Sequence, residues 1–155
     1  MSTRSRIGYQ DPETGQIVSS YVHMDGYPTG VGRDLVKNFG NWEAFKGVVD
    51  MGDQRTLGEP FTQSAFADER LGTQVSETLE EFLQLTMDNS GEYAYLAKPF
   101  PMGGDSEFFI DFEAYDTSDE ENGPYEIAIG SELDEYDNPH GWVGVSSGDE
   151  SAENE

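Results

Sequence analysis

The residues best suited to acid–base chemistry stand close together near the N-terminus, where His23 and Asp25 lie within residues 21–28. A histidine that is oriented by an aspartate can act as a general base or as a ligand, because its ring titrates near neutral pH. Catalysis at such a site needs a third group. The chain has no cysteine, and its other histidine, His140, lies far along the sequence.

A structural corner is the alternative interpretation of the same residues. In this corner Asp25 accepts the amides of a glycine turn, Tyr27 packs, and hydrogen bonds hold His23. The spacing brings no third group near His23, so the sequence predicts no catalytic residue. The residues kept as a motif are His23, Asp25, Gly26, Tyr27 and Pro28.

A second group of candidate residues comes from the C-terminal third of the chain. Residues 101–155 carry 17 Asp and Glu and no Lys or Arg, whereas residues 1–50 carry 6 acids and 5 bases. Carboxylates spaced along strands and loops can imitate phosphates and attract the basic surface of a protein partner, while aromatic rings supply desolvated anchors. The residues predicted to bind this partner are Phe109, Asp111, Glu113, Tyr115, Asp116, Asp119, Glu120 and Glu121.

Two other interpretations of the acidity are a solvated surface that maintains solubility and an adaptation to a salty cytoplasm. The chain has a net charge of −24 and only three lysines, which is compatible with salt adaptation. Such adaptation should acidify every exposed surface, however, and residues 1–50 are nearly neutral. This asymmetry favours a localised acidic face.

The composition argues against several other classes of function. The net charge of −24 should repel nucleic acid, and no apolar run approaches the length of a membrane span. Residues 116–123 and 134–141 do not match a calcium-binding EF-hand loop, and no phosphate-loop lysine follows Gly30 and Gly32. We therefore expect no metal, no cofactor, no direct contact with nucleic acid and no membrane association.

The elements that must position these residues begin with a predicted hairpin, whose strands span residues 4–9 and 17–23. Asp, Pro and Gly residues between them favour a turn. Apolar side chains at helical spacing then predict two short helices, at residues 31–39 and 42–51, with Asn41 as the N-cap of the second. Residues 53–72 show no clear period and are expected to form a loop.

A longer helix is predicted at residues 76–87, with Ser76 as its N-cap, and strands at 92–98, 107–115 and 125–131. In the middle strand, alternation places apolar residues on one face and acidic and aromatic residues on the other, which is expected to face solvent or a partner.

The predicted fold class is α+β, with an N-terminal hairpin, two short helices, a longer helix and an antiparallel three-strand unit. These strands could belong to one mixed sheet with the helices on one side. Residues 1–133 are expected to form one domain, and residues 134–155 an acidic, irregular tail.

Part of the chain, over about residues 1–57, resembles a family of small proteins of tailed phages that has no assigned activity. The resemblance lies in Ser5-Arg6-Ile7, in residues 21–28, in Gly30, Gly32 and Leu35, and in Met51-Gly52-Asp53. Met24 stands where the family usually has Trp. The resemblance implies a viral gene product that acts in the cytoplasm of an infected host cell, and it identifies no catalytic residue.

The function expected from these observations is that of a non-enzymatic viral accessory protein, which binds a basic host or viral protein through its acidic C-terminal half, with nucleic-acid mimicry as one form of such binding. One alternative is a virion component, such as a capsid decoration, neck or tail subunit. A second alternative is a small enzyme that uses His23 and Asp25. The sequence leaves the oligomeric state open.

Overall fold

The computed structural model describes residues 3–60, 72–101, 108–119, 121 and 123–127. Strands β1 (Ser5–Gln10) and β2 (Ile17–Val22) form the predicted N-terminal hairpin. In its turn, the carbonyl of Asp11 accepts the N–H of Gly15 at 2.8 Å, and its carboxylate accepts the N–H of Glu13 at 2.8 Å. Gly15 has φ of 77°, a left-handed conformation that favours glycine.

Three helical segments follow the hairpin. A π-helical turn, η1 (Pro28–Gly32), continues directly into α1 (Arg33–Asn38), and α2 (Trp42–Asp50) comes next. Asn41 is the N-cap of α2, since its side chain accepts the N–H of Ala44 at 2.9 Å. The two short helices predicted here are therefore confirmed, with a π-helical turn at the start of the first.

Helix α3 (Leu79–Asp88) is the predicted longer helix, but its N-cap is Thr78 and not Ser76. The Thr78 hydroxyl accepts the N–H of Glu81 at 3.1 Å, while the Glu81 carboxylate accepts the N–H of Glu77 at 2.7 Å. Ser76 instead ends strand β5 (Gln74–Ser76), which pairs with β2. Because Ser76 belongs to a strand, the helix begins later in the chain than predicted.

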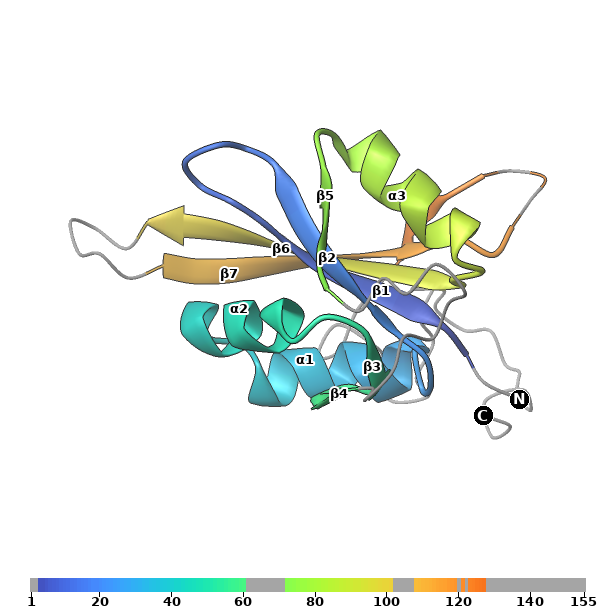
Figure 1. Cartoon of the computed structure of the whole chain (residues 1–155), viewed down its shortest axis with the longest axis horizontal. Helices are drawn as coiled ribbons and strands as arrows, with labels where there is room; N and C mark the ends of the chain where they lie inside the picture. The colour runs from blue at the N-terminus through green and yellow to red at the C-terminus, as the bar shows by residue number, and fades with distance from the viewer. Residues whose placement is uncertain (1–2, 61–71, 102–107, 120, 122, 128–155) are drawn as a thin grey trace, which may run out of the picture.

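The eight strands in the described residues join in one mixed sheet, in the order β4-β3-β2-β1-β6-β7-β8, with β5 paired to β2 off this path (Figure 1). The antiparallel three-strand unit is present, but it is part of this larger sheet because β6 pairs in parallel with β1. Two short strands also occupy part of the span predicted as a loop. The remaining strands are β3 (Gln54–Thr56), β4 (Glu59–Pro60), β6 (Tyr93–Pro101), β7 (Phe108–Asp116) and β8 (Tyr125–Ile127).

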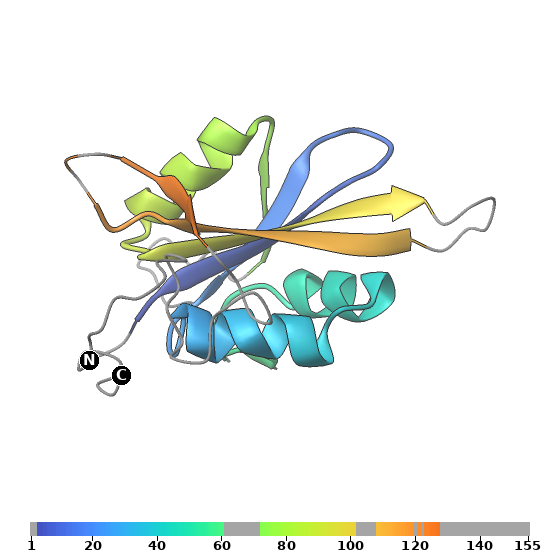
Figure 2. The same ribbon diagram turned by 180° about the vertical axis from the view of Figure 1, so that it is seen from behind.

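Helices cover both faces of the sheet, which corrects the expectation of helices on one side (Figures 1 and 2). On one face, Phe45 of α2 packs in a core with Ile7 and Tyr95. On the other face, Phe82 of α3 packs in a second core with Leu96 and other apolar residues of the sheet. Phe45 and Phe82 are both 0% exposed. The central strands carry apolar side chains on both faces of the sheet. Each face therefore needs a layer that covers it.

A buried arginine fixes the end of α3 against the hairpin. Arg6 of β1 is 2% exposed, and its Nε donates to the Ser19 hydroxyl while its Nη1 donates to Oδ1 of Asn89, each at 2.8 Å. Asn89 is the C-cap of α3, where a cation complements the helix dipole. This contact holds the C-terminal end of α3 in place.

The predicted tail at residues 134–155 lies outside the described residues, as does the end of the strand predicted at residues 125–131.

Candidate functional site

The motif residues carry the chain from the end of β2 into η1. His23 is half-buried, its Nδ1 lies 2.7 Å from the Tyr21 hydroxyl, and its backbone N–H donates to β3 at 2.9 Å. The Asp25 carboxylate accepts the hydroxyl of Tyr27 at 3.3 Å. The contact that orients the His23 ring is thus with Tyr21, whereas Asp25 is engaged by Tyr27.

The surroundings of His23 lower the pKa of its ring. Burial disfavours the charged imidazolium, and the nearby guanidinium of Arg4 repels it. Burial also raises the pKa of the Tyr21 hydroxyl, against an opposing effect of Arg4. The ring of His23 is therefore neutral at neutral pH.

This lowered pKa makes the stability contribution of His23 depend on pH. The unfolded chain binds the proton more readily, so the contribution is complete above the unfolded pKa of about 6.5 and is lost as pH falls through the lower folded value. We expect acidification from about pH 7.5 to about pH 5 to lower the Tm of the wild type relative to that of His23→Gln. Calorimetry on both proteins measures this difference, and a difference that does not change with pH would contradict the assignment.

The rest of the motif builds a tight corner. Asp25 has φ of 60°, and its carbonyl accepts the N–H of Val31 at 2.9 Å. Gly26 lies so close to Ser5 of β1 that a Cβ in its place would stand 2.7 Å from the Cβ of Ser5. Its carbonyl accepts the hydroxyl of Tyr95 of β6 at 2.7 Å. These contacts connect β1, β6 and η1 and give the corner a structural role, but Tyr27, which was expected to pack there, is 39% exposed.

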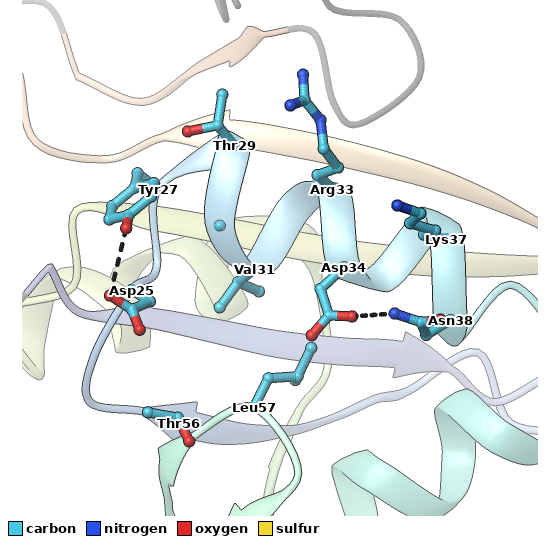
Figure 3. A pocket seen from close by; sticks show the side chains of 11 residues that line it. Asp25, Tyr27, Thr29, Val31, Arg33, Asp34, Lys37, Asn38, Thr56 and Leu57 are labelled. Carbon is cyan, nitrogen blue, oxygen red and sulfur yellow. Dashed lines mark hydrogen bonds between the residues drawn. The ribbon is translucent and has the colours of Figure 1, made fainter. Parts of the chain in front are cut away.

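A polar groove of about 530 Å³ opens beside this corner (Figure 3). Asp25 and Tyr27 stand at one end of it, and α1 contributes Arg33, Asp34 and Lys37. The side chains of two cations and two carboxylates line the groove, so their charges compensate. The charged side chains that line the groove therefore carry no net formal charge.

The acidic and aromatic face of β7 is less exposed than the sequence predicts. Tyr115 is 8% exposed because it packs with Phe82 under α3, and its hydroxyl donates to the Glu113 carboxylate at 2.6 Å. Glu113 also forms an ion pair with Lys98 of β6, with Nζ and Oε2 3.1 Å apart. Asp111 is exposed. The expectation that Tyr115 faces a partner is therefore wrong for the folded chain.

The predicted acids after β7 divide between structural and exposed positions. Asp116 is 5% exposed, and its Oδ1 accepts the N–H of Ser118 at 2.9 Å and the Ser118 hydroxyl at 2.6 Å, so it closes the turn and does not face a partner as expected. Asp119 is half-buried and accepts the N–H of Glu121 at 3.0 Å. Glu121 is exposed. Glu120 and the side chain of Phe109 lie outside the described residues.

Helix α3 carries acids that were not among the predicted binding residues. Its exposed carboxylates lie on the same face of the sheet as Glu126, which pairs with Tyr115 across β7 and β8. The connection between β7 and β8 runs beside α3 (Figures 1 and 2). We call this region the acidic surface, and it consists of Glu80, Glu81, Asp88, Glu121 and Glu126.

The sequence does contain a signal for this surface. No Lys or Arg occurs between residues 72 and 97 or after Lys98, so neither α3 nor the chain beyond β6 supplies a cation. Only the fold shows that these two segments, far apart in the chain, lie side by side.

A shallow groove lies within the acidic surface, between α3 and the connection from β7 to β8. Its volume is about 450 Å³. Leu83, Met87 and Pro124 contribute apolar side chains to its lining, and Glu80, Glu81 and Gln84 contribute polar ones. The arrangement combines an apolar contact area with surrounding negative charge.

Within the described ranges, no group of three or more His, Cys, Asp or Glu side chains could hold a metal ion. The helices of the described chain are also too short or too polar to cross a membrane. No protein-family model matches the sequence, and no curated protein or solved structure matches it.

Proposed function

We propose that this protein is a non-enzymatic binding protein that recognises a basic surface on a protein partner through the acidic surface of α3 and the connection from β7 to β8. The observation that carries the proposal is the gathering of exposed carboxylates from α3, this connection and β8 on one face, in segments without any Lys or Arg. The cations Arg33 and Lys37 stand on α1, over the opposite face of the sheet (Figure 1).

Physical chemistry supports this kind of partner. Carboxylates in segments that supply no Lys or Arg of their own keep much of their negative potential, which speeds the encounter with a basic surface and disfavours acidic partners, nucleic acid included. The resemblance of residues 1–57 to a phage family adds the proposal that the protein is a viral accessory protein acting in an infected cell. A partner that normally holds nucleic acid would make the acidic surface a phosphate mimic.

The test compares two triple variants with equal changes in net charge. E80Q/E121Q/E126Q neutralises three exposed acids of the acidic surface, and E13Q/E43Q/E59Q neutralises exposed acids of the hairpin turn, α2 and β4. Tagged proteins are used to recover partners from a lysate of infected host cells at low and high salt, and the affinity for each recovered basic protein is then measured. We expect the first variant to weaken binding by at least about tenfold and to flatten its salt dependence, while the second stays close to wild type.

Equal losses of affinity in the two variants would show that binding depends on net charge alone. This result would overturn the assignment of binding to the acidic surface. Recovery of phage structural proteins alone, independent of salt, would overturn basic-partner binding and support the virion alternative.

A further inference from the structure

We propose that the groove between α3 and the connection from β7 to β8 receives an apolar side chain from a partner segment that also carries Lys and Arg. This inference rests on the proposed function and specifies its partner as a basic amphipathic segment. It joins two features of the lining of this groove, which are the apolar side chains of Leu83, Met87 and Pro124 and the carboxylates of Glu80 and Glu81.

The α3 wall of the groove is firmly seated on the sheet. Phe82, which neighbours Leu83, is 0% exposed in the core under the helix, and Leu83 itself is 9% exposed. Glu80, Leu83 and Met87 follow one another at i, i+3 and i+7, so they form one stripe along the helix. Met87 is half-exposed and flexible, which suits apolar side chains of different shapes.

The opposite wall is set by the turn that carries Pro124. The carbonyl of Asp119 accepts the N–H of Gly123 at 2.9 Å, and Gly123 has φ of 79°. Asp116 closes the start of the same connection through Ser118. Pro124 follows Gly123 directly, and its ring limits the backbone further. The groove therefore lies between a packed helix and a hydrogen-bonded turn.

Charge complementarity selects the occupant. The carboxylates of Glu80 and Glu81 disfavour an acidic segment, and a purely polar polycation would leave the apolar walls in contact with water. A Leu, Met or Phe flanked by Lys or Arg would bury the apolar side chains of the groove and place its cations beside Glu80 and Glu81. Burial of the anchor also excludes water from the surrounding ion pairs, which strengthens them. Such a segment, at helical spacing, fits the arrangement of helix-in-groove recognition.

Two synthetic peptides of equal charge test the inference on the full-length chain. One is a Lys-rich amphipathic peptide with Leu at helical spacing, and the other carries Ser in place of each Leu. We expect fluorescence anisotropy to show at least about tenfold tighter binding of the Leu peptide, the difference that burial of one apolar side chain supplies. Met87→Gln should remove most of this preference. Met51→Gln, which changes an exposed methionine after α2, should leave it intact.

Equal, salt-sensitive binding of both peptides would overturn the groove inference and leave the proposed function standing. A Leu preference that survives Met87→Gln, in a variant with unchanged Tm, would also overturn it. Failure of both peptides to bind at low salt would overturn the proposed function together with the inference.

Discussion

Phe82→Ala is expected to lower the free energy of unfolding by about 3–5 kcal/mol, the usual cost of removing a fully buried aromatic ring. Phe82 is 0% exposed and joins α3 to the sheet through a core that includes Leu96 and Tyr115. A domain of ordinary stability has only about 5–15 kcal/mol available. The loss should be measured by urea unfolding, and Phe82→Leu, which removes less volume, provides a milder change if the alanine variant does not fold.

Phe45→Ala provides the comparison for Phe82→Ala in the other layer. Phe45 is also 0% exposed, and its ring packs edge-on against Phe112, with ring centroids 5.3 Å apart. Because both faces of the sheet are covered, the two variants should lose similar amounts of stability. A loss below about 1 kcal/mol for Phe82→Ala alone would show that α3 is not seated on the sheet as described.

Gly30→Ala is expected to lower the free energy of unfolding by about 1–3 kcal/mol, because the added methyl group overpacks the corner. Its Cβ would collide with the backbone carbonyl of Asp25 and would stand 2.8 Å from Cε1 of Tyr27. The ring of Tyr27 can move aside, but the carbonyl is held by the N–H of Val31. Thermal or urea unfolding measures the effect.

Gly47→Ala is the matched control, and its expected effect has the opposite sign. Gly47 lies on the exposed side of α2, and a Cβ there meets no atom within 4 Å. Alanine in a helix interior is more stable than glycine by about 0.5–1 kcal/mol. Equal effects of the two substitutions would contradict the crowding at Gly30.

These glycine contacts give the motif at residues 23–28 a structural explanation. Neighbouring atoms lie so close to Gly26 and Gly30 that a side chain at either position would collide with them. Asp25 adopts a left-handed conformation at the same corner. His23 is held by Tyr21 near the buried end of the hairpin. The motif therefore builds the corner that follows β2, while the features suited to partner binding lie on α3 and the connection from β7 to β8.

The sequence by itself determined the local elements. Turn residues defined the hairpin, apolar spacing defined α1, α2 and α3, and alternation defined β6 and β7, because each of these signals depends on neighbours along the chain. It also showed that the cations end at Lys98. The side chain of Asn41 was identified as a helix cap for the same local reason.

Only the tertiary structure decided which elements share a surface. The parallel pairing of β1 with β6 joins segments separated by most of the chain, and no local pattern encodes it. That pairing places α3 over Tyr115, so an aromatic residue predicted to be exposed became part of a core. It also brings Pro124 beside Met87. The groove exists because long-range burial of apolar area, and not local propensity, sets the position of α3 relative to the connection from β7 to β8.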